Sequence, residues 1–160
     1  MSEPSGLFAE QEAFNTVGSI LFGLLVDGDE RIEYRSSMTV AGVASKVMAF
    51  NPAGRLEAPS GRYNTPDTPY ALDRAFKVLR QACYRPGAGT WFSVLVVVQA
   101  SGAASVEYNY DREVDFSLGG IDPISYVTDQ EKFPRNVDQQ PEWLKLRLAE
   151  GRARLAARDK

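Results

Sequence analysis

The chain has 160 residues, of which 44% are hydrophobic and 24% charged, and its formal net charge is -3. This size and composition predict one soluble domain, because a single core usually serves roughly 100 to 200 residues. The sequence contains no histidine and one cysteine, Cys83. These counts exclude Ser-His-Asp and Cys-His catalysis, histidine general bases, the common zinc and non-haem iron sites, and an internal disulfide. We therefore expect no enzyme activity, no cofactor and no metal.

The cellular location is predicted from the first residues and from the apolar stretches. Residues 1–30 contain no Lys or Arg, so the basic opening of a secretory signal is missing. The longest apolar stretch, around residues 94–98, is far shorter than the roughly 18 to 20 residues of a membrane-spanning helix. We expect a cytoplasmic protein that binds no membrane.

The first predicted element is an amphipathic helix over about residues 5–26. Its apolar residues recur at intervals of three and four, which is the spacing of one helix face. Gly18 and Gly23 lie inside this helix, and each costs about 1 kcal/mol relative to alanine. We expect both glycines to allow close packing against a neighbour.

A hairpin follows, with strands over residues 31–40 and 43–50, and the polar, proline-bearing run 58–68 is expected to be a loop. The second helix has the clearest periodicity in the chain. Thr68 is its expected N-cap, with Pro69 as its first residue. Its apolar face comprises Leu72, Ala75, Phe76, Leu79, Ala82 and Cys83.

Two residues of the second helix carry specific expectations. Arg80 is expected on a face away from the core, near the helix C-terminus, where a cation opposes the negative end of the helix dipole. Cys83 lies on the apolar face, so we expect an inert core thiol, because reactive cysteines occupy exposed, electropositive settings.

Residues 90–100 are almost all β-branched or aromatic, which predicts a central strand that is apolar on both faces. We therefore expect helices or a second layer on both sides of at least part of the sheet. The next strand, over residues 106–111, alternates apolar and polar side chains, so one face is packed and the other wet. Residues 123–132 are expected to hold a short helical turn. A last helix from Glu142 is expected to fray into a basic tail from about residue 152.

These elements predict one α+β domain over residues 1–160. An antiparallel sheet of about four to six strands is expected to pack with the N-terminal, central and C-terminal helices.

The charges are distributed unevenly along the chain. Residues 103–131 contain a single base, Arg112, and seven acids: Glu107, Asp111, Glu113, Asp115, Asp122, Asp129 and Glu131. The last twenty residues are rich in Lys and Arg. An acidic middle argues against direct binding of nucleic acid and suits a basic protein partner. The alternative is a solvated acidic face without a partner.

Three catalytic or ligand-binding patterns fail on their details. The acids around Asp111 lack the regular ligand order of a calcium loop. The glycine-rich run 85–90 leads from helix to strand, the opposite of a phosphate-binding loop. Glu107 and Asp111 could serve a small hydrolase as paired carboxylates, but nothing in the sequence sets one of them to a raised pKa.

A set of aromatic, proline and arginine motifs runs through the second half of the chain. They are Tyr84-Arg85-Pro86-Gly87, Gly89-Thr90-Trp91-Phe92, Tyr108-Asn109-Tyr110-Asp111, Phe133-Pro134-Arg135 and Pro141-Glu142-Trp143-Leu144. In this order, over roughly residues 68–148, they resemble the YezG-like immunity proteins of bacterial polymorphic toxin systems, particularly the actinobacterial members.

This resemblance implies an antitoxin that binds a cognate toxin domain and blocks its active site. The motif residues Tyr84, Trp91, Phe92, Tyr108, Tyr110, Pro134, Arg135 and Trp143 are expected to be structural. The hypothesis for the toxin-binding residues names Glu107, Asp111, Glu113 and Asp115, whose charge could imitate the phosphates of a nuclease substrate. The alternative function is a non-catalytic adaptor or secretion chaperone for an effector protein.

Overall fold

The sheet contains six antiparallel strands in the order β3-β4-β2-β1-β5-β6. In the computed structural model, which describes residues 5–114, 116 and 120–159, four α-helices accompany it, and the expected α+β class is confirmed. The strands are β1 (Arg31–Thr39), β2 (Gly42–Phe50), β3 (Leu56–Ala58), β4 (Gly61–Asn64), β5 (Ser93–Gln99) and β6 (Ala104–Asn109). The helices are α1 (Leu7–Gly23), α2 (Tyr70–Ala82), α3 (Ile124–Lys132) and α4 (Glu142–Arg158), with a 3-10 turn, η1, at Val137–Gln139.

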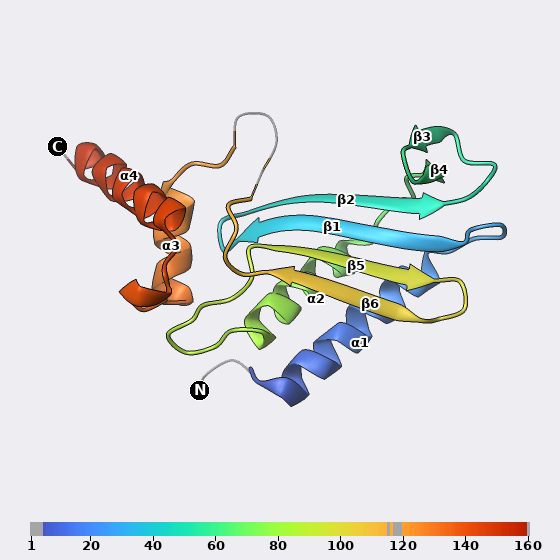
Figure 1. The fold of residues 1–160 in the computed structure, drawn as a ribbon, viewed down its shortest axis with the longest axis horizontal. Helices are drawn as coiled ribbons and strands as arrows, with labels where there is room; N and C mark the ends of the chain where they lie inside the picture. Colours follow the sequence, from blue (N-terminus) through green and yellow to red (C-terminus); the bar gives the residue numbers. More distant parts are fainter. Residues whose placement is uncertain (1–4, 115, 117–119, 160) are drawn as a thin grey trace.

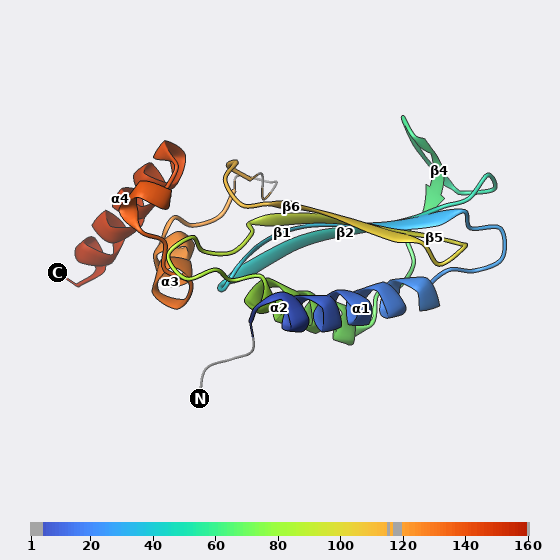
Figure 2. The same ribbon diagram turned by 60° about the horizontal axis from the view of Figure 1, so that its bottom comes forward.

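The helices occupy two places around the sheet. The helices α1 and α2 lie side by side on one face, whereas α3 and α4 lie beyond one end of it (Figure 1). Figure 2 shows that β4 and the chain after β6 rise on the side opposite α1 and α2. The face away from these two helices is therefore bordered at both ends.

The β1–β2 hairpin forms in the predicted place, with Arg31 opposite Phe50 and Thr39 opposite Gly42. The predicted loop over residues 58–68 is wrong in part, because β3 and β4 form a small second hairpin that pairs with the end of β2. Both strands are too short and polar to show a period. Tyr63 anchors them by packing on Phe50, with 5.8 Å between ring centroids.

The main core lies between the sheet and the α1–α2 layer. The apolar face of α2 is buried as predicted, and Phe76 stacks on Tyr34 of β1 with 3.8 Å between ring centroids. The Tyr34 hydroxyl donates to Asp73 Oδ1 at 3.1 Å, so this buried ring keeps a partner for its polar end. Burial raises the pKa of Tyr34 well above its usual value.

The second helix differs from its prediction at both ends. Pro69 occupies the N-cap, Tyr70 is the first helical residue, and no side chain caps the helix, so the predicted Thr68 cap is absent. Arg80 was expected to point away from the core, but it is only 2% exposed. Its burial follows from the partners that α3 and the chain before β5 provide.

The Arg80 guanidinium makes a two-pronged ion pair with Asp129 of α3, at 2.5 and 2.9 Å. Its Nε also donates to the Trp91 carbonyl at 2.7 Å. Asp129 Oδ1 accepts in addition the backbone N–H of Val40, at 2.9 Å. Charge and hydrogen bonds thus offset the cost of burying both ions.

The C-terminal region is more helical than predicted. Residues 124–132 form a complete helix, α3, and α4 continues to Arg158 although fraying was expected from about residue 152. Leu155 packs on the cluster that α3 and α4 build around Phe92, and Arg154 lies 3.3 Å from Asp122. These contacts account for the extra turns.

The helices cover one face of β5 only. The second layer expected over part of the sheet lies instead at the end of β2, where Met48 and Phe50 pack with Tyr63 of β4. Val94, Val96 and Val98 are buried under α1 and α2. Ser93, Leu95 and Val97 point the other way and are partly exposed.

The glycines of α1 do not mark close packing, and this expectation is also wrong. A Cβ added to Gly18 or Gly23 would meet no atom within 4 Å. Gly151 of α4 behaves as the α1 glycines were expected to, because its Cβ would lie 2.7 Å from Val127 Cγ2 of α3.

We predict that Gly18→Ala stabilises the protein and that Gly151→Ala destabilises it. The first should raise the free energy of unfolding by about 0.5 to 1 kcal/mol, since alanine restricts the unfolded chain and costs no space. The second should lower it by about 1 to 3 kcal/mol through overpacking. Urea unfolding measures both, and equal effects of the two substitutions would contradict the packing described.

We predict that Arg80→Ala lowers the free energy of unfolding by about 3 to 5 kcal/mol, because it leaves the Asp129 carboxylate buried without its cation. Arg74→Ala, on the exposed side of the same helix, is the matched control and should change stability by less than about 0.5 kcal/mol. Similar unfolding midpoints for the two variants would show that the buried pair contributes little.

Candidate binding surface

The sheet presents to solvent the face that α1 and α2 leave uncovered. Successive strand residues alternate between faces, so the register identifies the side chains that share it. This open face comprises Arg31, Glu33, Arg35 and Ser37 of β1, Ala44 and Lys46 of β2, Ser93, Leu95 and Val97 of β5, and Ser105 and Glu107 of β6. Met48 of β2 lies on the same side of the sheet but is buried in a cluster with Tyr63 of β4. A groove of about 730 Å³ lies on it, lined by these four strands and by residues 112–114.

Charged side chains lie in rows across the open face. In one row, Lys46, Arg35, Leu95 and Glu107 stand opposite one another on β2, β1, β5 and β6. Arg35 and Lys46 therefore place two cations side by side. Glu107 lies at the other edge of the same row, about 10 Å from Arg35 at the usual strand spacing.

Of the predicted toxin-binding acids, Glu107 and Glu113 line the groove of the open face, and Asp111 and Glu113 are paired with arginines. Glu107 is exposed on the open face, whereas Asp111 lies 3.1 Å from Arg135 and Glu113 lies 2.6 Å from Arg147 of α4. Asp115 lies outside the described residues. The acidic middle of the chain thus pairs in large part with the basic residues that follow it.

Arg135 belongs to the motifs that carry the family resemblance, and it is 5% exposed. Its guanidinium donates to Asp111, to the carbonyls of Thr90 and Tyr110, and to the Gln139 carbonyl at 3.4 Å. Burial lowers the pKa of Arg135, and the Asp111 carboxylate opposes that shift. One side chain therefore holds the ends of β5 and β6 to the segment after α3.

Gly89 leaves the space that Arg135 occupies. Its φ of +79° lies in the left-handed region, and a Cβ there would lie 2.7 Å from Arg135 Cγ. Pro134 stands directly before Arg135 and after Phe133, whose ring packs on Tyr84 at 5.5 Å between centroids.

The other motif residues are aromatic rings at the same junction. Phe92 meets Trp143 edge-on at 5.3 Å between centroids, and the Trp143 indole donates to the Asp111 carbonyl at 2.7 Å. Trp91 stacks on Tyr108 at 6.1 Å, on the helix side of the sheet. Phe92, Trp143 and Arg135 thus join the sheet to α3 and α4, whereas Trp91, Tyr108 and Tyr110 belong to the core under α1 and α2.

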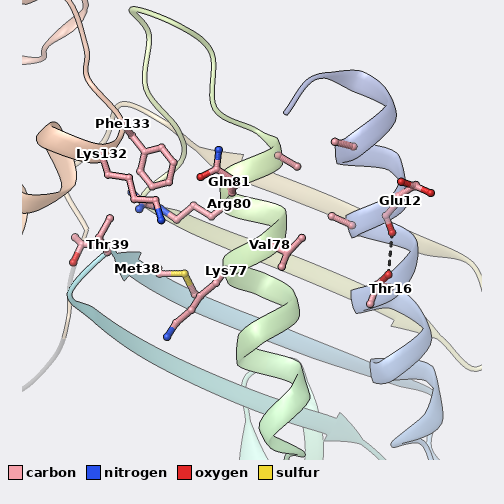
Figure 3. A pocket seen from close by; sticks show the side chains of 14 residues that line it. Glu12, Thr16, Met38, Thr39, Lys77, Val78, Arg80, Gln81, Lys132 and Phe133 are labelled. Atoms are coloured by element: carbon pink, nitrogen blue, oxygen red, sulfur yellow. Dashed lines mark hydrogen bonds between the residues drawn. The ribbon is translucent and has the colours of Figure 1, made fainter. Parts of the chain in front are cut away.

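A second groove, of about 640 Å³, lies on the helix side (Figure 3). It is lined by α1, α2, the end of β1 and the end of α3, with Met38 and Phe133 among its apolar side chains. Val78 of α2 borders it and is 60% exposed. This groove is mainly apolar, whereas the groove on the open face carries charges.

The structure offers little chemistry for catalysis among the residues that it describes. Cys83 is fully buried, as predicted, and burial raises the pKa of its thiol to about 11, so the reactive thiolate is disfavoured. No group of three potential metal ligands occurs in the described part of the chain. Among those residues no helix is both long and apolar enough to cross a membrane.

Sequence reasoning missed Arg35 and Lys46. The period-two alternation of charged and apolar residues in β1, from Arg31 to Arg35, was the available signal, but the partner strand and its register were not readable from it.

The sequence matches no family model and no curated protein.

Proposed function

We propose that this protein is an immunity protein that binds a cognate toxin domain in the cytoplasm and neutralises it by covering its active site. The family is inferred from the motif resemblance described above. The observation that carries the proposal is the open face, a surface of four strands that no helix of the described chain covers. It combines the apolar Leu95 and Val97 with charged side chains at its edges.

The physical properties of this surface suit protein binding. Protein interfaces combine an apolar centre with a polar, charged rim that orients the partner. Rigid strands present the side chains here, so little conformational entropy is lost on binding. An inhibitor that acts by covering an active site needs no nucleophile, base or metal of its own.

The partner in this proposal is a protein rather than a nucleic acid. Glu33 and Glu107 lie on the open face, and the whole chain carries a net charge of -3. Both features oppose a polyphosphate backbone, which is bound through clusters of Lys and Arg. Glu107 is exposed on this face and is positioned to meet a basic residue of the toxin.

We predict that Leu95→Arg abolishes protection and that Val78→Arg preserves it. An arginine replaces an apolar residue once at the centre of the open face and once on the exposed side of α2. As partner the test uses the terminal domain of a large protein encoded immediately upstream, where the proposed function places the toxin gene. Growth during co-expression reports neutralisation, and calorimetry with an inactivated form of that domain should show at least tenfold weaker binding for Leu95→Arg.

Ser105→Arg, at the exposed edge of the same face, is a second test of the interface in case Leu95→Arg does not fold. Urea unfolding shows whether all three variants are folded. Loss of protection with Val78→Arg alone would move the interface to the helix-side groove. A complex that forms without rescuing growth would favour the adaptor or chaperone alternative. Growth arrest that wild type fails to relieve would contradict the immunity function.

A further inference from the structure

Three cations on the open face, Arg31, Arg35 and Lys46, stand near a single carboxylate, Glu33. Glu33 lies 2.9 Å from Arg31 and 3.8 Å from Arg35. Lys46 stands opposite Arg35 in the β1–β2 register and forms no ion pair with the described carboxylates. Two positive charges are therefore in excess at this part of the sheet.

This arrangement costs stability. Like charges directly opposite each other on neighbouring strands repel. The two side chains turn apart: Arg35 approaches Glu33, and the Lys46 ammonium lies over the Tyr63 ring at 5.5 Å from its centroid. The other strand neighbour of Arg35 is the apolar Leu95, so the sheet supplies no second carboxylate there.

The two cations line the groove of the open face, where a partner can reach them. The Arg35 side chain is 60% exposed, and Lys46 is also exposed. The neighbouring lining residue Ser93 of β5 is small and polar. The groove therefore leaves room over the cations.

We propose that Arg35 and Lys46 bind the carboxylates of an acidic segment of the protein partner. This inference rests on the proposed function and specifies the chemistry of its interface. A guanidinium binds a carboxylate through two parallel hydrogen bonds, and an ammonium one strand away binds a second acid. The partner's charges then supply the neutralisation that the sheet lacks.

The acids on the same face select a polypeptide over a nucleic acid. Glu33 lies beside Arg35, and Glu107 lies two strands away in the same row. A continuous phosphate backbone would meet both, whereas a polypeptide can present acids to β1 and β2 and a base to β6. The face thus favours one orientation of a mixed-charge segment.

The test uses the intact chain and three short probes. Hexaglutamate, hexalysine and a six-residue oligothymidylate are titrated into the isotopically labelled protein, and amide shifts are followed by NMR. We expect hexaglutamate to shift amides of β1 and β2 around Arg35 and Lys46, with an affinity that falls as salt is added. We expect Lys46→Glu to weaken this binding at least tenfold.

Lys77→Glu is the matched control, because it makes the same charge change on the exposed side of α2. Its affinity for hexaglutamate should stay within twofold of wild type. Lys46→Glu should also raise the urea midpoint, because it places opposite charges across β1 and β2. A higher urea midpoint together with weaker hexaglutamate binding would show that Lys46 acts in binding and not only in the structure of the sheet.

The inference is wrong if hexaglutamate leaves the β1 and β2 amides unshifted, if Lys46→Glu binds it as tightly as wild type, or if the oligothymidylate binds more tightly than hexaglutamate. These outcomes differ from failure of the proposed function. Wild type that rescues growth but ignores hexaglutamate refutes only the acidic segment. Wild type that binds hexaglutamate but fails to rescue growth refutes the immunity function and leaves the anion-binding surface.

Discussion

The structure depends on satisfying two arginine side chains that are buried at one end of the sheet. A buried guanidinium is tolerated only when its donors find acceptors and its charge finds a counter-ion. Arg80 of α2 meets Asp129 and the Trp91 carbonyl, and Arg135 meets Asp111 and backbone carbonyls of the β5 and β6 ends. Each set of acceptors comes from segments far apart in sequence, so the two arginines define how those segments meet.

The location of these arginines explains why one face of the sheet is open. Asp129 lies on α3 and also accepts the N–H of Val40, at the β1–β2 turn. This contact holds α3 at the end of the hairpin, and α4 packs on α3 through Gly151. The C-terminal helices therefore lie beyond the sheet, where they cannot cover Leu95 or the charged rows of the open face. The packing that secures the fold thus determines the surface available to a partner.

The sequence predicts well what depends on local periodicity and poorly what depends on distant partners. The α2 stripe and the β1–β2 hairpin follow from spacing alone, and the fold class follows from the order of elements. Arg80 was misplaced because its acceptor, Asp129, lies 49 positions away. The apolar strand β5 indicated a second layer over part of the sheet, yet the composition of one strand cannot say which strands that layer reaches, and it covers the end of β2 instead.

The candidate site shows the same division. The acidic character of Glu107, Asp111 and Glu113 was visible, but their partners among later residues, such as Arg147, were not. Ion pairs within the fold offset the negative charges of Asp111 and Glu113. Charge that remains unbalanced therefore carries more information about a partner than charge counted along the chain. By that criterion the open face is the informative surface, because it places cations on β1 and β2, an acid on β6 and an apolar residue between them. This arrangement orients a partner through complementary charges at close range rather than through the net charge of the protein.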